Sequence, residues 1–242
     1  MSILSKIKQT NHKQIALLID PDKYNKPLLT NQIDSAIEAK VDYIFLGGSL
    51  ISNDASDLCI SLIKSKCTIP IIIFPGNGTH LNANADAILF LSLISGRNAD
   101  LLIGNHVHVA PMIKRQKIES ISTGYMLIES GTITTAQYMS NTLPIPHNKS
   151  EVAVATAIAG EMLGLKMIYL DGGSGAQQPI SEKMISAVKA NIDLPLIVGG
   201  GIRNKETALG MAKAGADLIV VGNAAEENPK LIIEIAKYIR QL

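Results

Sequence analysis

Three glycine clusters, each following a short run of apolar residues, carry the strongest chemical signal in this sequence. They occur within residues 169–175, 197–201 and 220–223. Each apolar run has the length and the branched side chains that are typical of a buried parallel strand. Glycines after such strands leave main-chain N–H groups free to approach an anion closely. The three turns together predict a phosphate-binding cup made of main chain, which needs no lysine or arginine.

Two carboxylates stand one residue apart after the first apolar run, in the segment Asp20-Pro21-Asp22. Mg²⁺ takes one or two carboxylates, keeps several waters and bridges to substrate phosphates. A second apolar run ends at Ser49, which brings a hydroxyl next to the first. Asp20 and Ser49 would then form a sparse magnesium site that a diphosphate completes. The same residues also make a favourable turn, and the sequence alone weighs the two interpretations equally.

Asp171 ends the sixth apolar run, beside the glycine clusters. A carboxylate there can orient a hydroxyl of a phosphate-bearing substrate and accept its proton, although a turn or cap role is the alternative. Glu129 ends the fifth run without an evident role. Arg97 follows the fourth, where it would meet a second phosphate or begin a helix in solvent. His106 and His108 point to different faces of a predicted helix, which favours structural roles.

The order of the elements indicates how these groups are positioned. Short apolar runs predict eight strands, at residues 15–19, 43–46, 71–74, 87–91, 124–128, 167–170, 196–198 and 218–221. Amphipathic helices are predicted at residues 28–39, 54–65, 98–116, 150–163, 181–191, 204–213 and 227–240. The link at residues 79–86 is too short for a full helix and is interpreted as a turn. Residues 130–149, which contain Pro144 and Pro146, are interpreted as a long irregular segment.

Eight alternations of strand and helix predict an α/β fold that closes into a (β/α)₈ (TIM) barrel with a short or degenerate third helix. A doubly wound open sheet is the competing architecture. No linker divides the chain, so we expect a single domain over residues 1–242. The carboxyl ends of barrel strands form the active site, and the turns after strands seven and eight often hold phosphate. The glycine clusters, Asp20, Ser49 and Asp171 all fall at such ends.

Composition excludes several classes of protein. Hydrophobic residues make up 47% of the chain and mean hydropathy is +0.22, so a large core is easily formed. A net charge of +1 argues against nucleic acid or an anionic membrane as a general partner. No apolar run approaches the roughly 20 residues of a membrane span, and no signal peptide is expected. Cys59 and Cys67 have no metal-ligand companions and are expected to be free thiols in a reducing cytoplasm.

Five segments in this order resemble the geranylgeranylglyceryl phosphate synthase family of TIM-barrel prenyltransferases, which includes the bacterial heptaprenylglyceryl phosphate synthases. They are residues 17–23, 46–49, 169–176, 199–202 and 221–223, and the resemblance covers nearly the whole chain. Residues 124–129 and 138–146 resemble the larger, geranylgeranyl-type group. Leu18 stands where the other group carries a lysine that helps to bind glycerol phosphate, which favours the geranylgeranyl-type group.

The resemblance implies a reaction and its site. It implies that sn-glycerol 1-phosphate occupies the cup, and that Mg²⁺ on Asp20 and Ser49 bridges to a prenyl diphosphate. Asp171 would deprotonate the glycerol hydroxyl, which attacks the allylic carbon to form an ether. The family carries glutamate in place of Asp171 and arginine in place of His147. A homo-oligomer, either a dimer or a hexamer, is implied as well. The implied glycerol phosphate ligands are Tyr169, Leu170, Asp171, Gly172, Gly173, Ser174, Gly175, Gly200, Gly201, Gly222 and Asn223.

Two other functions stay open at this point. The first is another phosphate-binding barrel enzyme, such as a sugar-phosphate isomerase, which needs an acid and a base on opposite strands or a Schiff-base lysine. No lysine lies inside a predicted strand, which argues against the lysine mechanism. The second is a non-catalytic barrel that binds a phosphorylated metabolite. The prenyl chain length does not follow from the residues.

Overall fold

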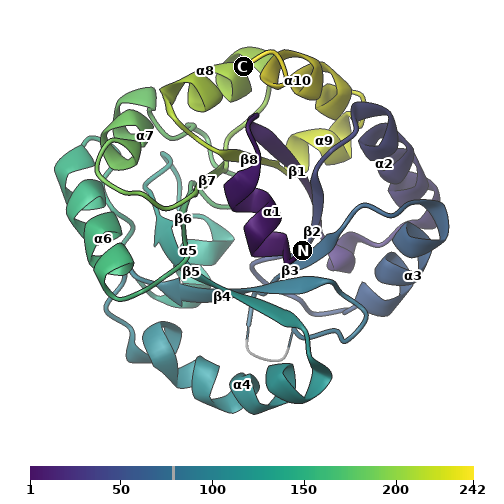
Figure 1. Ribbon diagram of the computed structural model, residues 1–242, viewed down its shortest axis with the longest axis horizontal. Coiled ribbons are helices and arrows are strands. Elements are labelled where there is room, and N and C mark those ends of the chain that lie inside the picture. The colour runs from purple at the N-terminus through teal and green to yellow at the C-terminus, as the bar shows by residue number, and fades with distance from the viewer. Residues whose placement is uncertain (78–79) are drawn as a thin grey trace.

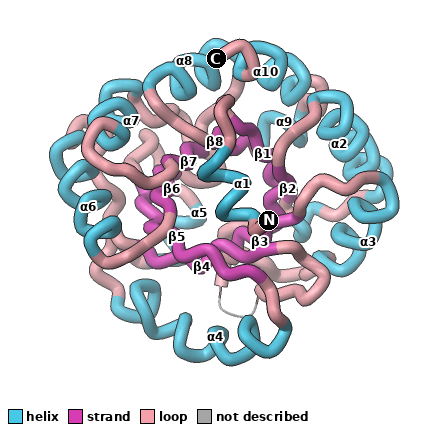
Figure 2. The backbone as a smooth tube through the Cα atoms, viewed as in Figure 1, coloured by secondary structure: helices cyan, strands magenta, loops and turns pink. Residues whose placement is uncertain are grey.

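The computed structural model describes residues 1–77 and 80–242 and shows a closed parallel barrel whose strands follow chain order from β1 to β8. Helices surround the strands in a ring (Figures 1 and 2). The predicted (β/α)₈ barrel is therefore confirmed. The strands are β1 Gln14–Ile19, β2 Tyr43–Gly47, β3 Ile71–Phe74, β4 Ala87–Leu93, β5 Glu119–Leu127, β6 Met167–Asp171, β7 Leu196–Gly199 and β8 Leu218–Val221. The longer helices outside the barrel are α2 Lys26–Ala39, α3 Ser56–Lys66, α4 Asn105–Gln116, α6 Ser150–Met162, α7 Glu182–Lys189, α8 Lys205–Ala214 and α10 Leu231–Ile239.

Alternate residues of each strand face two separate apolar cores. Phe45, Ile72 and Tyr169 belong to the cluster that fills the barrel. Their strand neighbours, such as Ile44 and Ile71, pack beneath the helices instead. Because both faces of the strands are buried, the strands are nearly continuous apolar runs, which is why the sequence located all of them.

A short N-terminal helix, α1 Ile3–Gln9, closes the barrel at the amino ends of the strands and was not predicted. It lies across the centre of the barrel in Figure 1. Ile3 and Ile7 join the cluster that fills the barrel. The carboxylate of Glu119, at the start of β5, accepts hydrogen bonds from the N–H groups of Ile3 at 2.7 Å and Leu4 at 2.9 Å. These bonds satisfy main-chain donors that a helix start leaves free.

Several predicted boundaries were wrong for identifiable reasons. Strand β5 begins at Glu119 and not at 124, because its first residues alternate with serine and do not form an apolar run. The predicted helix 227–240 is α10, which begins only at Leu231, after Pro229, and a separate short helix, α9 Asn223–Glu227, precedes it. The predicted helix 98–116 begins as a π-helical turn, η2 Asp100–Gly104, before α4. The irregular segment 130–149 contains a short helix, α5 Thr135–Ser140.

The barrel wall is weakest between β3 and β4. These strands pair only at Ile72–Ala87 and Ile73–Ile88, whereas β4 pairs with β5 along its whole length. Residues 80–86 contain no helix, which agrees with the predicted degenerate third helix; residue 79 lies outside the described residues. The ring of helices is accordingly interrupted between α3 and α4 (Figure 1). β4 thus extends beyond Phe74, the end of β3, without a neighbour on that side.

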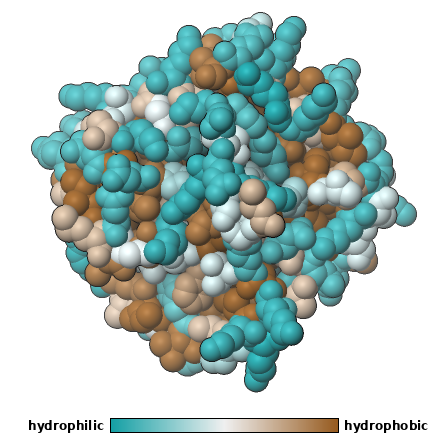
Figure 3. Space-filling view, in the orientation of Figure 1, coloured by the Kyte–Doolittle hydropathy of each residue, from teal (hydrophilic) through white to brown (hydrophobic). Residues whose placement is uncertain are grey.

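The outer surface adds two observations. On the face shown in Figure 3, hydrophobic residues gather over α6 and α4, where Met162 and Val107 are among the exposed apolar side chains. Within residues 1–77 and 80–242, no helix has the length and apolar character to cross a membrane. Cys59 and Cys67 are free, as expected, and burial raises the pKa of the Cys59 thiol to about 12.

Candidate active site

A cavity of about 590 Å³ opens at the carboxyl ends of the strands. The turns after β6, β7 and β8 form one side of it, and the ends of β1 and β2 form the other. The structure thus brings the glycine clusters, Asp171 and the Asp20–Ser49 pair to one cavity, at the end where a barrel places its chemistry.

The glycine side of the cavity is a cup of main-chain donors. Gly175, Gly200 and Gly201 have φ angles of +84°, +87° and +72°, which are accessible to glycine at little cost. In the described part of the chain, the N–H groups of Ser174, Gly175 and Gly201 have no protein acceptor. The Asn223 side-chain amide donates to Ser174 Oγ at 3.2 Å and joins two of the turns. Unpaired N–H groups that converge on a cavity suit a phosphate.

Two of the predicted cup residues are not brought to the cavity. The side chain of Leu170 is fully buried in the core between strands and helices. The Gly172 N–H donates to the Gly199 carbonyl at 3.0 Å, so it extends the sheet and is not available to a ligand. The predicted residues that do line the cavity are Tyr169, Asp171, Gly173, Ser174, Gly175, Gly200, Gly201, Gly222 and Asn223.

Replacing Gly200 with valine is expected to weaken the binding of a phosphate ester in this cup, such as the glycerol phosphate that the resemblance implies, at least a hundredfold. A Cβ at position 200 would lie 2.6 Å from Gly172 N and 2.9 Å from Gly173 N, so the turn after β6 must move. Losing two charge-assisted hydrogen bonds of about 1.5 kcal/mol each gives this magnitude. Calorimetric titration measures the affinity. Gly164→Val is the matched control, because Gly164 has the same φ of +87° and no atom within 4 Å of its Cβ position. Wild-type affinity in Gly200→Val would place the phosphate elsewhere.

Asp171 is a buried carboxylate with both oxygens held. Its Oδ2 accepts a hydrogen bond from the Tyr125 hydroxyl at 2.6 Å, and its Oδ1 accepts one from the Gly173 N–H at 2.8 Å. Burial raises the pKa of Asp171, and these two hydrogen bonds oppose that rise only in part. Asp171 is therefore fixed in orientation, and it is a stronger base than an exposed aspartate.

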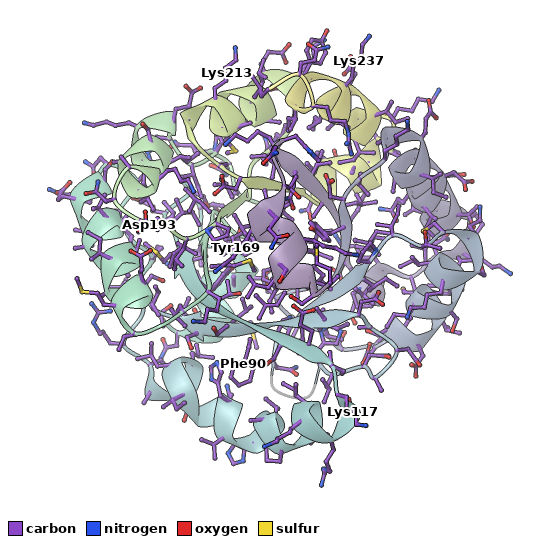
Figure 4. The ribbon with its side chains drawn as sticks, in the orientation of Figure 1. Phe90, Lys117, Tyr169, Asp193, Lys213 and Lys237 are labelled. Atoms are coloured by element: carbon purple, nitrogen blue, oxygen red, sulfur yellow. The ribbon has the colours of Figure 1, made fainter. Side chains whose placement is uncertain are left out.

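Tyr125 is a functional residue that the sequence analysis missed. Its ring lies 5.5 Å from that of Tyr169 at nearly a right angle, and Phe74 stacks on Tyr169 at 5.4 Å. Figure 4 shows Tyr169 inside the barrel. Tyr125 is the register partner of Tyr169, so the strand alternation could have placed it next to the cavity.

Asp20 and Ser49 both line the cavity, on neighbouring strand ends. A methyl group at position 48 would lie 3.1–3.3 Å from the atoms of the Asp20 carboxyl group, so the turn that carries Ser49 packs directly against it. Asp20 Oδ1 accepts the Asp22 N–H at 3.1 Å. Asp22 itself accepts the N–H groups of Ser52 at 2.6 Å and Asn53 at 3.0 Å, and it therefore ties the β2 turn to the β1 turn.

The oxygen donors of this pair fit Mg²⁺. One carboxylate and one hydroxyl are hard ligands, and magnesium completes its shell with water and substrate phosphates. Within the described residues, no group of three or more histidine, cysteine or acidic side chains could hold a metal by itself. A protein-only metal cage is thus not present in this part of the chain, and a substrate-completed site suits it better.

Comparison with known proteins identifies the family to which this chain belongs. The profile of the PcrB family matches residues 7–239. Geranylgeranylglyceryl phosphate synthase of Spirosoma linguale is 48% identical over 241 residues, which cover 100% of this chain and 97% of the relative. The chain belongs to the geranylgeranylglyceryl phosphate synthase (PcrB) family. The synthase of Methanothermobacter marburgensis is 39% identical, over 92% of this chain and 90% of the relative. The crystal structure of (S)-3-O-geranylgeranylglyceryl phosphate synthase from Thermoplasma acidophilum in complex with sn-glycerol-1-phosphate superposes with a TM-score of 0.93, at 33% identity and 100% coverage of both chains.

In this member of the synthase family, a second cavity of about 320 Å³ adjoins the first. Both cavities are lined by Gly48, Ser49 and Phe74. The second follows β4 through the open side of the barrel wall and is enclosed by residues of α4. Figure 4 shows Phe90 between β4 and α4. Most of the lining is apolar.

Two histidines line this second cavity without adding charge. His80 Nε2 lies 3.0 Å from Ser56 Oγ, and the His106 ring meets Phe90 edge to face at 4.4 Å. Burial lowers the pKa of both imidazoles. Both are therefore neutral at physiological pH, and the surroundings stay suited to an apolar ligand.

The remaining candidate residues brace loops. Glu129 Oε2 accepts the His147 N–H at 3.2 Å, and His147 Nε2 lies 3.1 Å from the Pro179 carbonyl oxygen. Arg97 is exposed and donates to the carbonyl of its neighbour Gly96 at 2.8 Å. Neither Arg97 nor Glu129 lines the two cavities.

Proposed function

We propose that this protein is a magnesium-dependent prenyltransferase that joins geranylgeranyl diphosphate to sn-glycerol 1-phosphate through an ether bond. One observation carries the proposal. A cavity lined by glycine turns with unpaired N–H groups, by the fixed Asp171 carboxylate and by Asp20 and Ser49 shares Gly48, Ser49 and Phe74 with an adjoining apolar cavity. Such a site matches a substrate pair in which one partner is a small phosphate ester and the other a long hydrocarbon with a charged head.

The glycerol phosphate occupies the cup. Its phosphate is bound by main-chain N–H groups of the turns after β6, β7 and β8, and this places its free hydroxyl toward Asp171. The Thermoplasma acidophilum relative, whose structure is a complex with its substrate sn-glycerol-1-phosphate, supports this assignment. Tyr125 and the Gly173 N–H keep the Asp171 carboxylate in one orientation. This fixed orientation compensates for an aspartate side chain that is shorter than the glutamate found at this place in the family.

The prenyl chain occupies the apolar cavity along β4. From Ile88 to Leu93 this strand spans roughly 16 Å at 3.3 Å per residue, and both residues line the cavity. A long hydrocarbon therefore has an apolar path along β4 that starts at Ser49, one of the proposed metal ligands.

The reaction is an exchange of one C–O bond for another. The glycerol oxygen bonds to the allylic carbon, the bond from that carbon to the diphosphate breaks, and its electron pair leaves with the diphosphate. Asp171 takes the proton of the glycerol hydroxyl. Asp20 and Ser49 would hold Mg²⁺, which stabilises the charge of the leaving diphosphate when it is bound.

Enlarging Val109 should shorten the preferred chain. Val109 lines the apolar cavity from α4, and phenylalanine there would overfill it at a cost of about 1–3 kcal/mol for a chain that reaches this depth. We expect kcat/KM for the C20 diphosphate to fall about tenfold or more, while that for the C15 diphosphate changes little. Val107→Phe is the control, because Val107 is 64% exposed on the same helix. An equal loss for both chains would contradict the assignment of the cavity.

Release of pyrophosphate tests the proposed function. We expect release from geranylgeranyl diphosphate that requires sn-glycerol 1-phosphate and stops when a chelator is added. Release without glycerol phosphate would indicate a hydrolase. Tight glycerol phosphate binding with no release, for any prenyl chain, would favour the non-catalytic barrel that the sequence left open.

A further inference from the structure

The proposed reaction brings a diphosphate to a side of the cavity that is acidic. Asp20, Glu226 and Glu227 line it there. Among the described lining residues of this cavity, Arg203 is the only lysine or arginine, and it donates to the Ala176 carbonyl at 3.1 Å, on the glycerol phosphate side. A divalent cation on Asp20 offsets only part of the diphosphate charge. A further positive group near Asp20 would offset more of that charge.

Lys23 lies close to Asp20, in a small hollow beside the cavity, and is paired with Glu226. Its Nζ lies 2.7 Å from Glu226 Oε2, in an ion pair that joins the turn after β1 to α9. Lys23, Glu226 and Asp20 line one small hollow behind the cavity wall.

The two partners of this pair differ in their freedom to move. The Lys23 side chain is 52% exposed, whereas that of Glu226 is 16% exposed and forms part of the cavity wall. Lysine carries its charge on a flexible stem and binds phosphates as a point charge. Glu226 therefore holds the Lys23 ammonium group next to a residue of the cavity wall, and Lys23 is the more exposed partner of the pair.

We propose that Lys23 binds the diphosphate of the prenyl substrate, and that Glu226 holds Lys23 in reserve until the diphosphate arrives. This inference rests on the proposed function. The ammonium exchanges a carboxylate for diphosphate oxygens and donates hydrogen bonds without transferring its proton. It stabilises the negative charge that accumulates on the diphosphate when the allylic C–O bond breaks.

A purely structural ion pair makes a different prediction. If the pair only fastened the β1 turn to α9, removing either partner would have the same effect, and diphosphate affinity would not respond. If Glu226 instead holds Lys23 until the diphosphate arrives, removing the two partners changes the diphosphate affinity in opposite directions. Removing Lys23 takes away a ligand, whereas neutralising Glu226 takes away its competitor.

The test is calorimetric titration of the full-length protein with inorganic pyrophosphate in the presence of Mg²⁺. Lys23→Met should raise the Kd about tenfold or more, as expected for a lost charged hydrogen bond. Glu226→Gln should lower the Kd by about two- to fivefold, which corresponds to a half-exposed ion pair. Lys205→Met and Glu234→Gln, which break a remote pair with a 3.5 Å separation, should leave the Kd unchanged. Glycerol phosphate affinity should be unchanged in all four variants.

Other outcomes overturn the inference without touching the proposed function. Wild-type affinity in Lys23→Met, or equal weakening in Lys23→Met and Glu226→Gln, would show that Lys23 does not bind the diphosphate. Lys23→Gln serves in its place if the methionine variant does not fold, as judged by circular dichroism. The proposed function fails separately, if the wild-type protein releases no pyrophosphate from any prenyl diphosphate.

Discussion

Asp171→Asn should lose prenyl transfer by about 10²- to 10⁴-fold, the usual contribution of a general base, and yet remain at least as stable as the wild type at neutral pH. Asparagine can keep both contacts of Asp171, because its Oδ1 can accept the Gly173 N–H and its Nδ2 can donate to the Tyr125 hydroxyl oxygen. Only the charge and the proton-accepting capacity are removed. Steady-state kinetics measures the loss.

The stability expectation follows from the raised pKa of Asp171. The folded protein binds a proton at this carboxyl more tightly than the unfolded chain does. The free energy of unfolding therefore falls as the pH rises from the ordinary value of 3.8 through the raised pKa, and the loss persists at neutral pH. Asparagine carries no titrating carboxyl group, so the variant does not undergo this loss of unfolding free energy. Thermal unfolding at pH 7 should show the variant at or above the wild type, and the difference should shrink as the pH falls below the window.

Tyr125→Phe separates positioning from proton transfer. It keeps the aromatic contact with Tyr169 but removes the 2.6 Å hydrogen bond to Asp171. We expect kcat to fall by less than in Asp171→Asn, with little change in glycerol phosphate affinity. Wild-type turnover in Asp171→Asn would show that another group accepts the proton.

Asp20→Asn is expected to reduce prenyl transfer roughly a thousandfold, because a bound metal supplies several kcal/mol of charge stabilisation in such reactions. The variant should fold, since the asparagine oxygen can still accept the Asp22 N–H that Asp20 Oδ1 accepts at 3.1 Å. Glycerol phosphate should bind normally, because the cup is formed by the turns after β6, β7 and β8. Kinetics with saturating Mg²⁺ and calorimetry with glycerol phosphate measure the two effects.

A remote carboxylate provides the control for Asp20. Asp34 on α2 pairs with Lys66 at 2.6 Å, and its side chain is 56% exposed. Asp34→Asn changes the net charge by the same amount and should leave the rate unaltered. Unchanged turnover in Asp20→Asn would remove Asp20 from the metal site, and loss of glycerol phosphate binding would place it in the cup.

The sequence predicted the barrel because its strands are buried on both faces and its glycines mark the turns. The same pattern placed Asp171 and the Asp20–Ser49 pair at strand ends, and the strand ends of a closed barrel converge. Those predictions depend only on strand order. They do not need the positions of individual side chains.

The sequence analysis did not predict the features that depend on tertiary contacts. Helix α1 has only 7 residues, so its Ser2 cap and the spacing of Ile3 and Ile7 are a weak signal, and much of its stabilisation comes from the barrel interior and from Glu119, far away in the chain. The apolar cavity exists because β4 continues past the end of β3, so that it pairs with β5 over more residues than with β3. No sequence motif indicates such a difference in strand pairing. The Tyr125–Asp171 bond joins residues 46 positions apart. The Gly172 N–H was assigned to the cup, but it is used by the Gly199 carbonyl across the sheet.

The central claim is tested most directly by identifying the product. Purified protein is incubated with Mg²⁺, labelled sn-glycerol 1-phosphate and C15, C20 and C35 prenyl diphosphates together, and the labelled lipid is analysed by mass spectrometry after treatment with alkali. The account predicts an alkali-resistant ether that carries one phosphate and a C20 chain, formed about 10²- to 10⁴-fold more slowly when Asp171→Asn replaces the wild type. An alkali-labile product, or no labelled lipid while glycerol phosphate binds tightly, would contradict it.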